Sequence, residues 1–150
     1  MGLFDRIFNS NAGIIYKPNN DKEAWVAILY ACMSVDGEVS NIEIDNMVKS
    51  LVFKQKFQNV QIIDYYKPAM VAQNKIGSKA IIDSSISLIL NEDKPTLFCL
   101  VMELLLADGH LGDKEKEIAE YLTSLLELDI SVATSIVEVM LIKNKGNVIL

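Results

Sequence analysis

Two short acidic segments hold the side chains best suited to chemistry, and they share one pattern. Residues 36–43 read Asp-Gly-Glu-Val-Ser-Asn-Ile-Glu, and residues 108–115 read Asp-Gly-His-Leu-Gly-Asp-Lys-Glu. Each segment lies between two apolar stretches, and residues 28–51 align with residues 100–123 as an internal repeat. Because carboxylates at fixed loop positions are the ligands that hard cations prefer, the repeat indicates a cation site.

The spacing from Asp to Glu reproduces the second half of an EF-hand calcium loop. The first half is missing, because its ligand positions fall on Cys32 and Ser34 in one copy and on Leu104 and Leu106 in the other. One half-loop gives too few of the roughly six to eight oxygens that calcium takes, so a site requires both copies. The predicted ligands of Ca²⁺, or of another divalent cation such as Zn²⁺ or Mg²⁺, are Asp36, Glu43, Asp108 and Glu115.

The same residues also have a purely structural interpretation. Gly37 and Gly109 favour the left-handed backbone that ends a helix. Ser40 and a glutamate three residues later form a capping box at the start of the next helix, and Gly112 occupies the matching cap position in the second copy. On this interpretation the motif caps helices and binds nothing, and the sequence leaves both interpretations open.

The elements that position the motif are expected to be helices. Apolar residues recur at helical spacing, and no stretch alternates as a strand does. We expect an all-α fold, a compact bundle of about seven helices in which the two copies form pseudo-symmetric helical hairpins. The expected helices span residues 21–35, 41–54, 58–73, 77–90, 94–107, 113–127 and 131–143.

Two residues are expected to interrupt this series, and one boundary divides the chain. Pro68 should kink or split the third helix, because proline lacks a backbone donor and clashes with the preceding turn. Gly77 is a plausible end of the same helix. The 150 residues, 51% of them hydrophobic, suit one domain, which we place at residues 21–150 behind an N-terminal segment of residues 1–20.

Composition excludes several classes of protein. The net charge is −6, and the acidic residues concentrate in residues 21–53 and 93–130, which would repel a nucleic-acid backbone. Apolar stretches are shorter than the ~20 residues that a membrane span needs, and residues 1–16 do not resemble a secretory signal. The sequence thus predicts a cytoplasmic protein, in which Cys32 and Cys99 are buried, inert thiols because their neighbours are apolar.

Catalysis is not expected. His110 is the single histidine, and its place in the second loop predicts an exposed side chain. Neither a phosphate-binding glycine loop nor a nucleophile with a base can be assembled from the sequence.

The N-terminal segment carries an apolar stripe if residues 2–9 are helical. Such a stripe can dock on the bundle, on a partner or on a membrane surface. We favour docking on the bundle, since Arg6 is the single basic side chain in residues 2–9 and lipid contact has little support. The stripe consists of Leu3, Phe4, Ile7 and Phe8.

The apolar helix, its Asp-Gly-x-Val-Ser-x-x-Glu hairpin, and the second copy that ends in Leu-Glu-Leu-Asp129 resemble the TerB family of tellurite-resistance proteins over residues 21–143. The opening Met-Gly-Leu-Phe-Asp-Arg-Ile-Phe is similar to the start of TerB proteins, and related domains occur at the front of a membrane-anchored DnaJ-like co-chaperone. The resemblance implies a bundle of about seven helices in a bacterial stress-response system, with other stress-response proteins as partners and no known catalytic activity. The acidic positions that it associates with metal binding are Asp36, Glu43, Asp108 and Glu115.

Motif and resemblance together predict a non-enzymatic TerB-like stress-response domain that binds a divalent cation at its paired loops. The alternative is a protein-interaction scaffold, or co-chaperone-like adaptor, in which the motif only caps helices.

Overall fold

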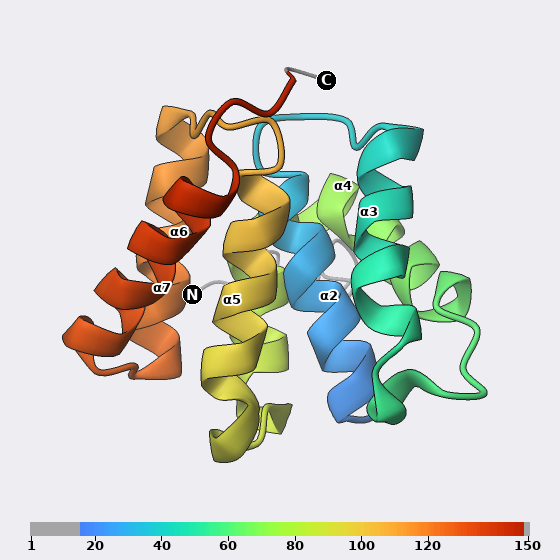
Figure 1. Cartoon of the computed structure of the whole chain (residues 1–150). Coiled ribbons are helices and arrows are strands. Elements are labelled where there is room, and N and C mark those ends of the chain that lie inside the picture. The colour runs from blue at the N-terminus through green and yellow to red at the C-terminus, as the bar shows by residue number, and fades with distance from the viewer. Residues whose placement is uncertain (1–15, 149–150) are drawn as a thin grey trace, which may run out of the picture.

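The computed structural model describes residues 16–148, which form an α-helical bundle without a strand (Figure 1). The all-α prediction is confirmed. The α-helices are α2 (Asp21–Met33), α3 (Asn41–Val52), α4 (Ile63–Ser85), α5 (Lys94–Leu105), α6 (Asp113–Leu126) and α7 (Ile130–Lys143). Three short 3-10 turns complete the described chain: η1 (Gln55–Phe57), η2 (Ile86–Leu88) and η3 (Asn91–Asp93).

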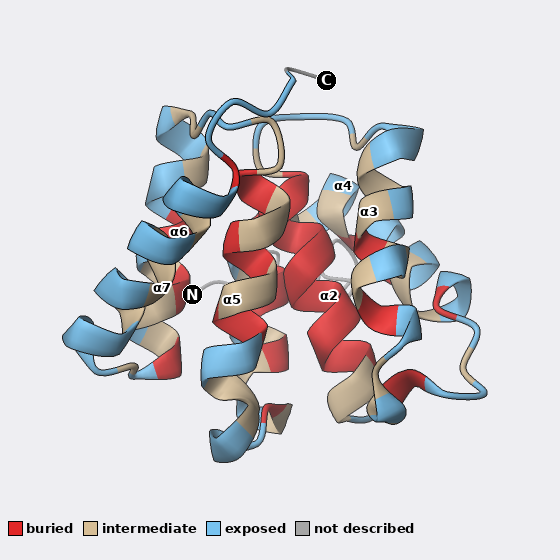
Figure 2. Cartoon of the chain, in the orientation of Figure 1, coloured by how far each residue is buried: buried red, intermediate tan, exposed pale blue. Residues whose placement is uncertain are grey.

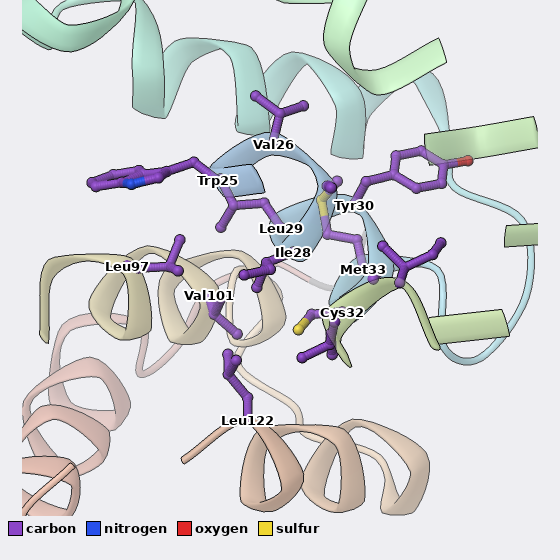
Figure 3. Packing of buried hydrophobic residues seen from close by; sticks show 14 of the residues in the cluster. Trp25, Val26, Ile28, Leu29, Tyr30, Cys32, Met33, Leu97, Val101 and Leu122 are labelled. Atoms are coloured by element: carbon purple, nitrogen blue, oxygen red, sulfur yellow. The ribbon is translucent and has the colours of Figure 1, made fainter. Parts of the chain in front are cut away.

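Helix α2 forms the centre of the bundle. All of its residues from Glu23 to Met33 are buried, as the red ribbon of Figure 2 shows. A helix that is apolar all round is stable in water only when other elements surround it, and α4, α5 and α6 all pack on α2. Figure 3 shows Leu97 and Val101 of α5 and Leu122 of α6 pointing towards it. The motif loops are therefore attached to a rigid core.

The predicted number of about seven helices differs from the six in the described residues. The expected helices at 58–73 and 77–90 correspond to α4, in which two helical segments meet at a kink. Gly77 is non-helical at the kink (φ 81°, ψ 171°), so its predicted role as the end of a helical segment is confirmed. Pro68 does not split α4, because it lies in the second turn and is exposed. The carbonyl that loses its helical partner there belongs to exposed Asp64, and water can satisfy it.

The course of the chain brings the two motif copies to one end of the bundle. Helices α2 and α5 pack against each other and run in the same direction, and the loops that follow them both lie at the top of Figure 1. Helices α3 and α6 then start from that end. Within residues 16–148 no helix has both the length and the apolar character that crossing a membrane requires.

Candidate metal centre

The two motif loops form the same tight turn after their helices. The Gly37 amide donates to the Ser34 carbonyl at 3.2 Å, and the Gly109 amide donates to the Leu106 carbonyl at 2.8 Å. Both glycines have positive φ, +139° and +77°, which residues with a side chain rarely adopt. The glycines lie three residues beyond the capping residues Ser34 and Leu106. They therefore shape the turn, and the prediction that these glycines themselves end the helices is wrong.

The predicted caps at the starts of the next helices, α3 and α6, are present. In the first loop the Glu43 amide donates to Ser40 Oγ at 3.2 Å, and Glu43 Oε1 accepts from the Ser40 amide at 3.1 Å. In the second loop Glu115 Oε1 accepts from the Gly112 amide at 3.0 Å. Because glycine has no hydroxyl, the second copy makes only this half of the box.

The structure brings the predicted ligands of both copies to one cavity. A hollow of about 310 Å³ lies between the loops, and all four predicted carboxylates line it: Asp36, Glu43, Asp108 and Glu115. Three further polar side chains line the hollow, Glu38, Ser40 and Asn46, and its apolar residues are Met33, Leu104, Leu105 and Ala107. Sequence reasoning missed Glu38 and Asn46, which occupy variable positions of the motif or lie beyond it.

The cavity has a negative potential that couples the two loops. Asp36 is exposed, whereas Glu43, Asp108 and Glu115 are half-buried. Burial raises the pKa of Glu115 above its ordinary value, and the charges of Asp36 and Asp108 raise it further. The hydrogen bond from the Gly112 amide and the nearby His110 act in the opposite direction on this pKa. A carboxylate of the second loop thus responds to one from the first.

The cavity is wider than a direct coordination sphere. Among residues 16–148 no three Asp, Glu, His or Cys side chains are gathered in an arrangement that could hold a metal ion. One oxygen of Glu43 and one of Glu115 are engaged in caps, and Asp108 Oδ1 accepts from the His110 amide at 3.0 Å. In type, these oxygen donors suit a hard cation, which can also bind carboxylates through water.

The C-terminal turn holds the second loop in place. Asn147 Nδ2 donates to the Ala107 carbonyl at 2.9 Å, directly before the motif. Asn144 is buried, and its amide donates to the Met140 carbonyl at 2.9 Å and to Glu103 Oε2 at 3.3 Å. An asparagine after an apolar helix is a helix-stop signal, so the sequence could have identified Asn144 as a helix cap. It could not have identified Glu103, 41 residues away, as the residue that Asn144 contacts.

The cysteines and the histidine lie outside this cavity's lining. Cys32 is buried, and burial raises the pKa of its thiol to about 12, which agrees with the predicted inert thiol. Cys99 is only half-buried, so its predicted full burial is wrong, although burial again raises the pKa of its thiol. His110 is exposed in the second loop, as predicted.

Comparisons of the chain with protein-family models, with curated proteins and with solved structures found no match. The resemblance to the TerB family therefore stays a hypothesis, which rests on the repeated motif. We infer function from the site itself.

Proposed function

We propose that this chain is a cytoplasmic, non-enzymatic, TerB-like stress-response domain of the tellurite-resistance type that binds a divalent cation between its paired acidic loops. One observation supports the cation site above all: the carboxylates of two motif copies far apart in the chain line a single cavity. Helix capping alone does not require a common cavity, because the capping bonds of each loop join residues of that loop only. A site shared between two pseudo-symmetric hairpins does require one.

The donor set favours Ca²⁺ or Mg²⁺ over Zn²⁺. The lining offers carboxylate, amide and hydroxyl oxygens and no imidazole or thiol, whereas zinc prefers nitrogen and sulfur ligands. At ~30 Å³ for each water molecule, a cavity of this size holds roughly ten waters. We infer that a partly hydrated cation enters and that some of the carboxylates bind it through water, as proteins commonly bind Mg²⁺.

Charge compensation supplies the driving force for binding. Asp36 and Asp108 disfavour the charged form of Glu115, so a proton or a cation in the cavity relieves their repulsion. Since ligands must be deprotonated, cation binding at this site is expected to release protons and to strengthen as the pH rises.

The test is calorimetric titration of Ca²⁺, then Mg²⁺ and Zn²⁺, into the metal-stripped protein. The variant Asp36→Asn/Asp108→Asn removes two cavity charges while keeping the glutamates that cap the helices. We expect saturable binding to the parent chain and its loss in this variant. The control Asp45→Asn/Asp64→Asn makes the same change in charge at two exposed positions outside the cavity, and it should bind as the parent does.

Absence of saturable binding by the parent chain, or an equal loss in the control, would contradict the proposal. The second outcome would mean that diffuse negative charge, and not a site, attracts the cation.

The alternative function is a protein-interaction scaffold, or co-chaperone-like adaptor for other stress-response proteins. It is favoured by the engagement of Glu43 and Glu115 in helix caps. Such a scaffold should be indifferent to cations, and Ser40→Ala should cost only about 1 kcal/mol of stability. Cation titration therefore separates the two functions.

A further inference from the structure

Helix α7 is as apolar in sequence as the central helix α2 but has no buried residue. It reads Ile-Ser-Val-Ala-Thr-Ser-Ile-Val-Glu-Val-Met-Leu-Ile-Lys, with Ile130 83% exposed and Leu141 50% exposed. In Figure 2 α7 is pale blue and tan, whereas α2 is red. Exposed apolar residues gathered on one helix mark a surface that something else can cover, and Ile130 also lines a groove.

A mostly apolar groove of about 430 Å³ runs between α6 and α7. Helix α7 packs mainly on α5, whose Phe98 and Met102 line the bottom of the groove. At 1.5 Å per residue, the α7 wall from Ile130 to Val137 is about 10 Å long. The walls comprise Lys116, Ala119, Glu120 and Thr123 of α6 and Ile130, Ala133, Thr134, Val137 and Glu138 of α7.

We propose that residues 2–9 of the same chain occupy this groove as a short helix, with Leu3, Phe4, Ile7 and Phe8 directed into it. Eight helical residues are about 12 Å long, which matches the groove. The stripe offers two aromatic and two aliphatic side chains to a lining of the same chemistry. This inference is independent of the cation site.

The described chain begins where such a segment can reach the groove. Tyr16 is buried, so the chain already lies against the bundle at that residue. The start of α2, a few residues later, and the α6–α7 turn lie at the same end of the bundle, the lower end of Figure 1. Between Tyr16 and the proposed helix, residues 10–15 supply up to about 20 Å of extended chain.

Charge favours this occupant over a membrane. On a helix over residues 2–9, Asp5 and Arg6 flank the apolar stripe on opposite sides. One direction in the groove sets Arg6 on the side of Glu138 of α7 and Asp5 on the side of α6, where Lys116 and Glu120 balance each other, whereas the reverse sets Asp5 against Glu138. A single cation gives little attraction to anionic lipid, which binds clusters of basic residues.

A disulfide trap in the full chain tests the contact. In a Cys99→Ala background, which leaves buried Cys32, the pair Ile7→Cys and Ala133→Cys should form a disulfide within one chain on mild oxidation. Non-reducing electrophoresis and peptide mass spectrometry detect it. The control pair Ile7→Cys and Asp45→Cys, on exposed α3, should crosslink at least several-fold less. Equal crosslinking of the two pairs, or no crosslinking, would overturn the proposal. Crosslinking between chains would also overturn it, and would indicate that a second copy of the chain occupies the groove.

A second measurement separates docking on the bundle from docking on lipid. Phe4→Asp/Phe8→Asp should speed amide hydrogen exchange in α7 and leave α3 unchanged. The parent chain should not sediment with vesicles of phosphatidylcholine and phosphatidylglycerol. Unchanged exchange in α7, or sedimentation that the two aspartates abolish, would overturn the proposal.

Discussion

The two acidic loops form the same turn but are held by different interactions. The first loop depends on its own residues: Ser40 and Glu43 complete a capping box, and a Cβ built on Gly37 would meet no atom within 4 Å. The second loop lacks the hydroxyl, and a Cβ on Gly109 would lie 3.2 Å from the carbonyl oxygen of Asn144. Local sequence determines the first loop, whereas the second is positioned by the C-terminal turn.

Because of this difference, the two loops contribute to the proposed cation site in different ways. The first loop brings exposed Asp36 to the cavity, and the second brings Glu115, whose pKa is raised by burial and by the charges of Asp36 and Asp108. Changes at the C-terminal turn should thus alter the second loop and leave the first one intact.

The largest expected effect comes from Gly109→Ala. The substitution forces a side chain into a left-handed conformation and against the Asn144 carbonyl, and together these should cost about 3 kcal/mol of unfolding free energy. Gly37→Ala is the matched control. Its φ of +139° also strains an alanine, but the new Cβ meets no atom within 4 Å, so we expect the cost of backbone strain alone, about 2 kcal/mol. Urea denaturation followed by circular dichroism measures both.

Equal costs for the two alanines would show that the C-terminal turn yields readily. The proposed difference between the loops would then be wrong.

Asn144→Ala should be the next most damaging change. The buried side-chain amide donates to the Met140 carbonyl and to Glu103, and it accepts from Asn147 Nδ2. Its loss removes all three hydrogen bonds from the C-terminal turn, at a cost of about 2 kcal/mol. Hydrogen exchange should accelerate in residues 107–112 and not in residues 35–40. Asn74→Ala, at an exposed position of α4, should change neither. Faster exchange in both loops would contradict separate support.

The sequence predicts the first loop better than the second because capping is local. Ser40 and Glu43 are three residues apart, and their bonds follow from that spacing. The link from Asn147 to Ala107 joins residues 40 positions apart, and a pattern search along one segment does not detect it. The repeat was enough to predict which carboxylates belong together, but the distances between them depend on how α2 and α5 pack.

Helix boundaries show the same limit. Periodicity predicts α2, α6 and α7 to within a few residues, because each has an apolar stretch and clear ends. At Pro68 sequence rules favour a break, yet this residue is exposed, where solvent can satisfy the freed carbonyl, and the helix continues past it to the kink at Gly77. Local propensity therefore predicts the elements, and solvent exposure decides whether a breaker interrupts them.

Substitutions at the two helix-cap positions, residues 40 and 112, test whether local capping stabilises the first loop more than the second. Ser40→Ala removes the hydroxyl that accepts from the Glu43 amide and should cost about 1 kcal/mol. Gly112→Ser supplies the missing hydroxyl to the second loop and should gain a few tenths of a kcal/mol. The new Cβ would lie 3.2 Å from Glu115 Oε1, the end of a side chain that can shift. Thermal melts of both variants should show a lower melting temperature for Ser40→Ala and a slightly higher one for Gly112→Ser. A loss of stability in Gly112→Ser would contradict the prediction.

The smallest expected effect is a pH dependence at Glu115. A carboxylate whose folded pKa is raised above its ordinary 4.5 binds more protons in the folded state, so stability falls as the pH rises through the window between the two values. Glu115→Gln removes this penalty while its amide oxygen still accepts from Gly112. The melting temperature of the variant relative to the parent should therefore be higher at about pH 7 than at about pH 4.

The same measurement in an Asp36→Asn background links the two loops. Asp36 helps to raise the Glu115 pKa, so the pH-dependent advantage of Glu115→Gln should shrink when that charge is absent. An advantage of unchanged size would attribute the shift to burial within the second loop. The two loops would then be neighbours without electrostatic coupling, and a cation in the cavity would have less repulsion to relieve.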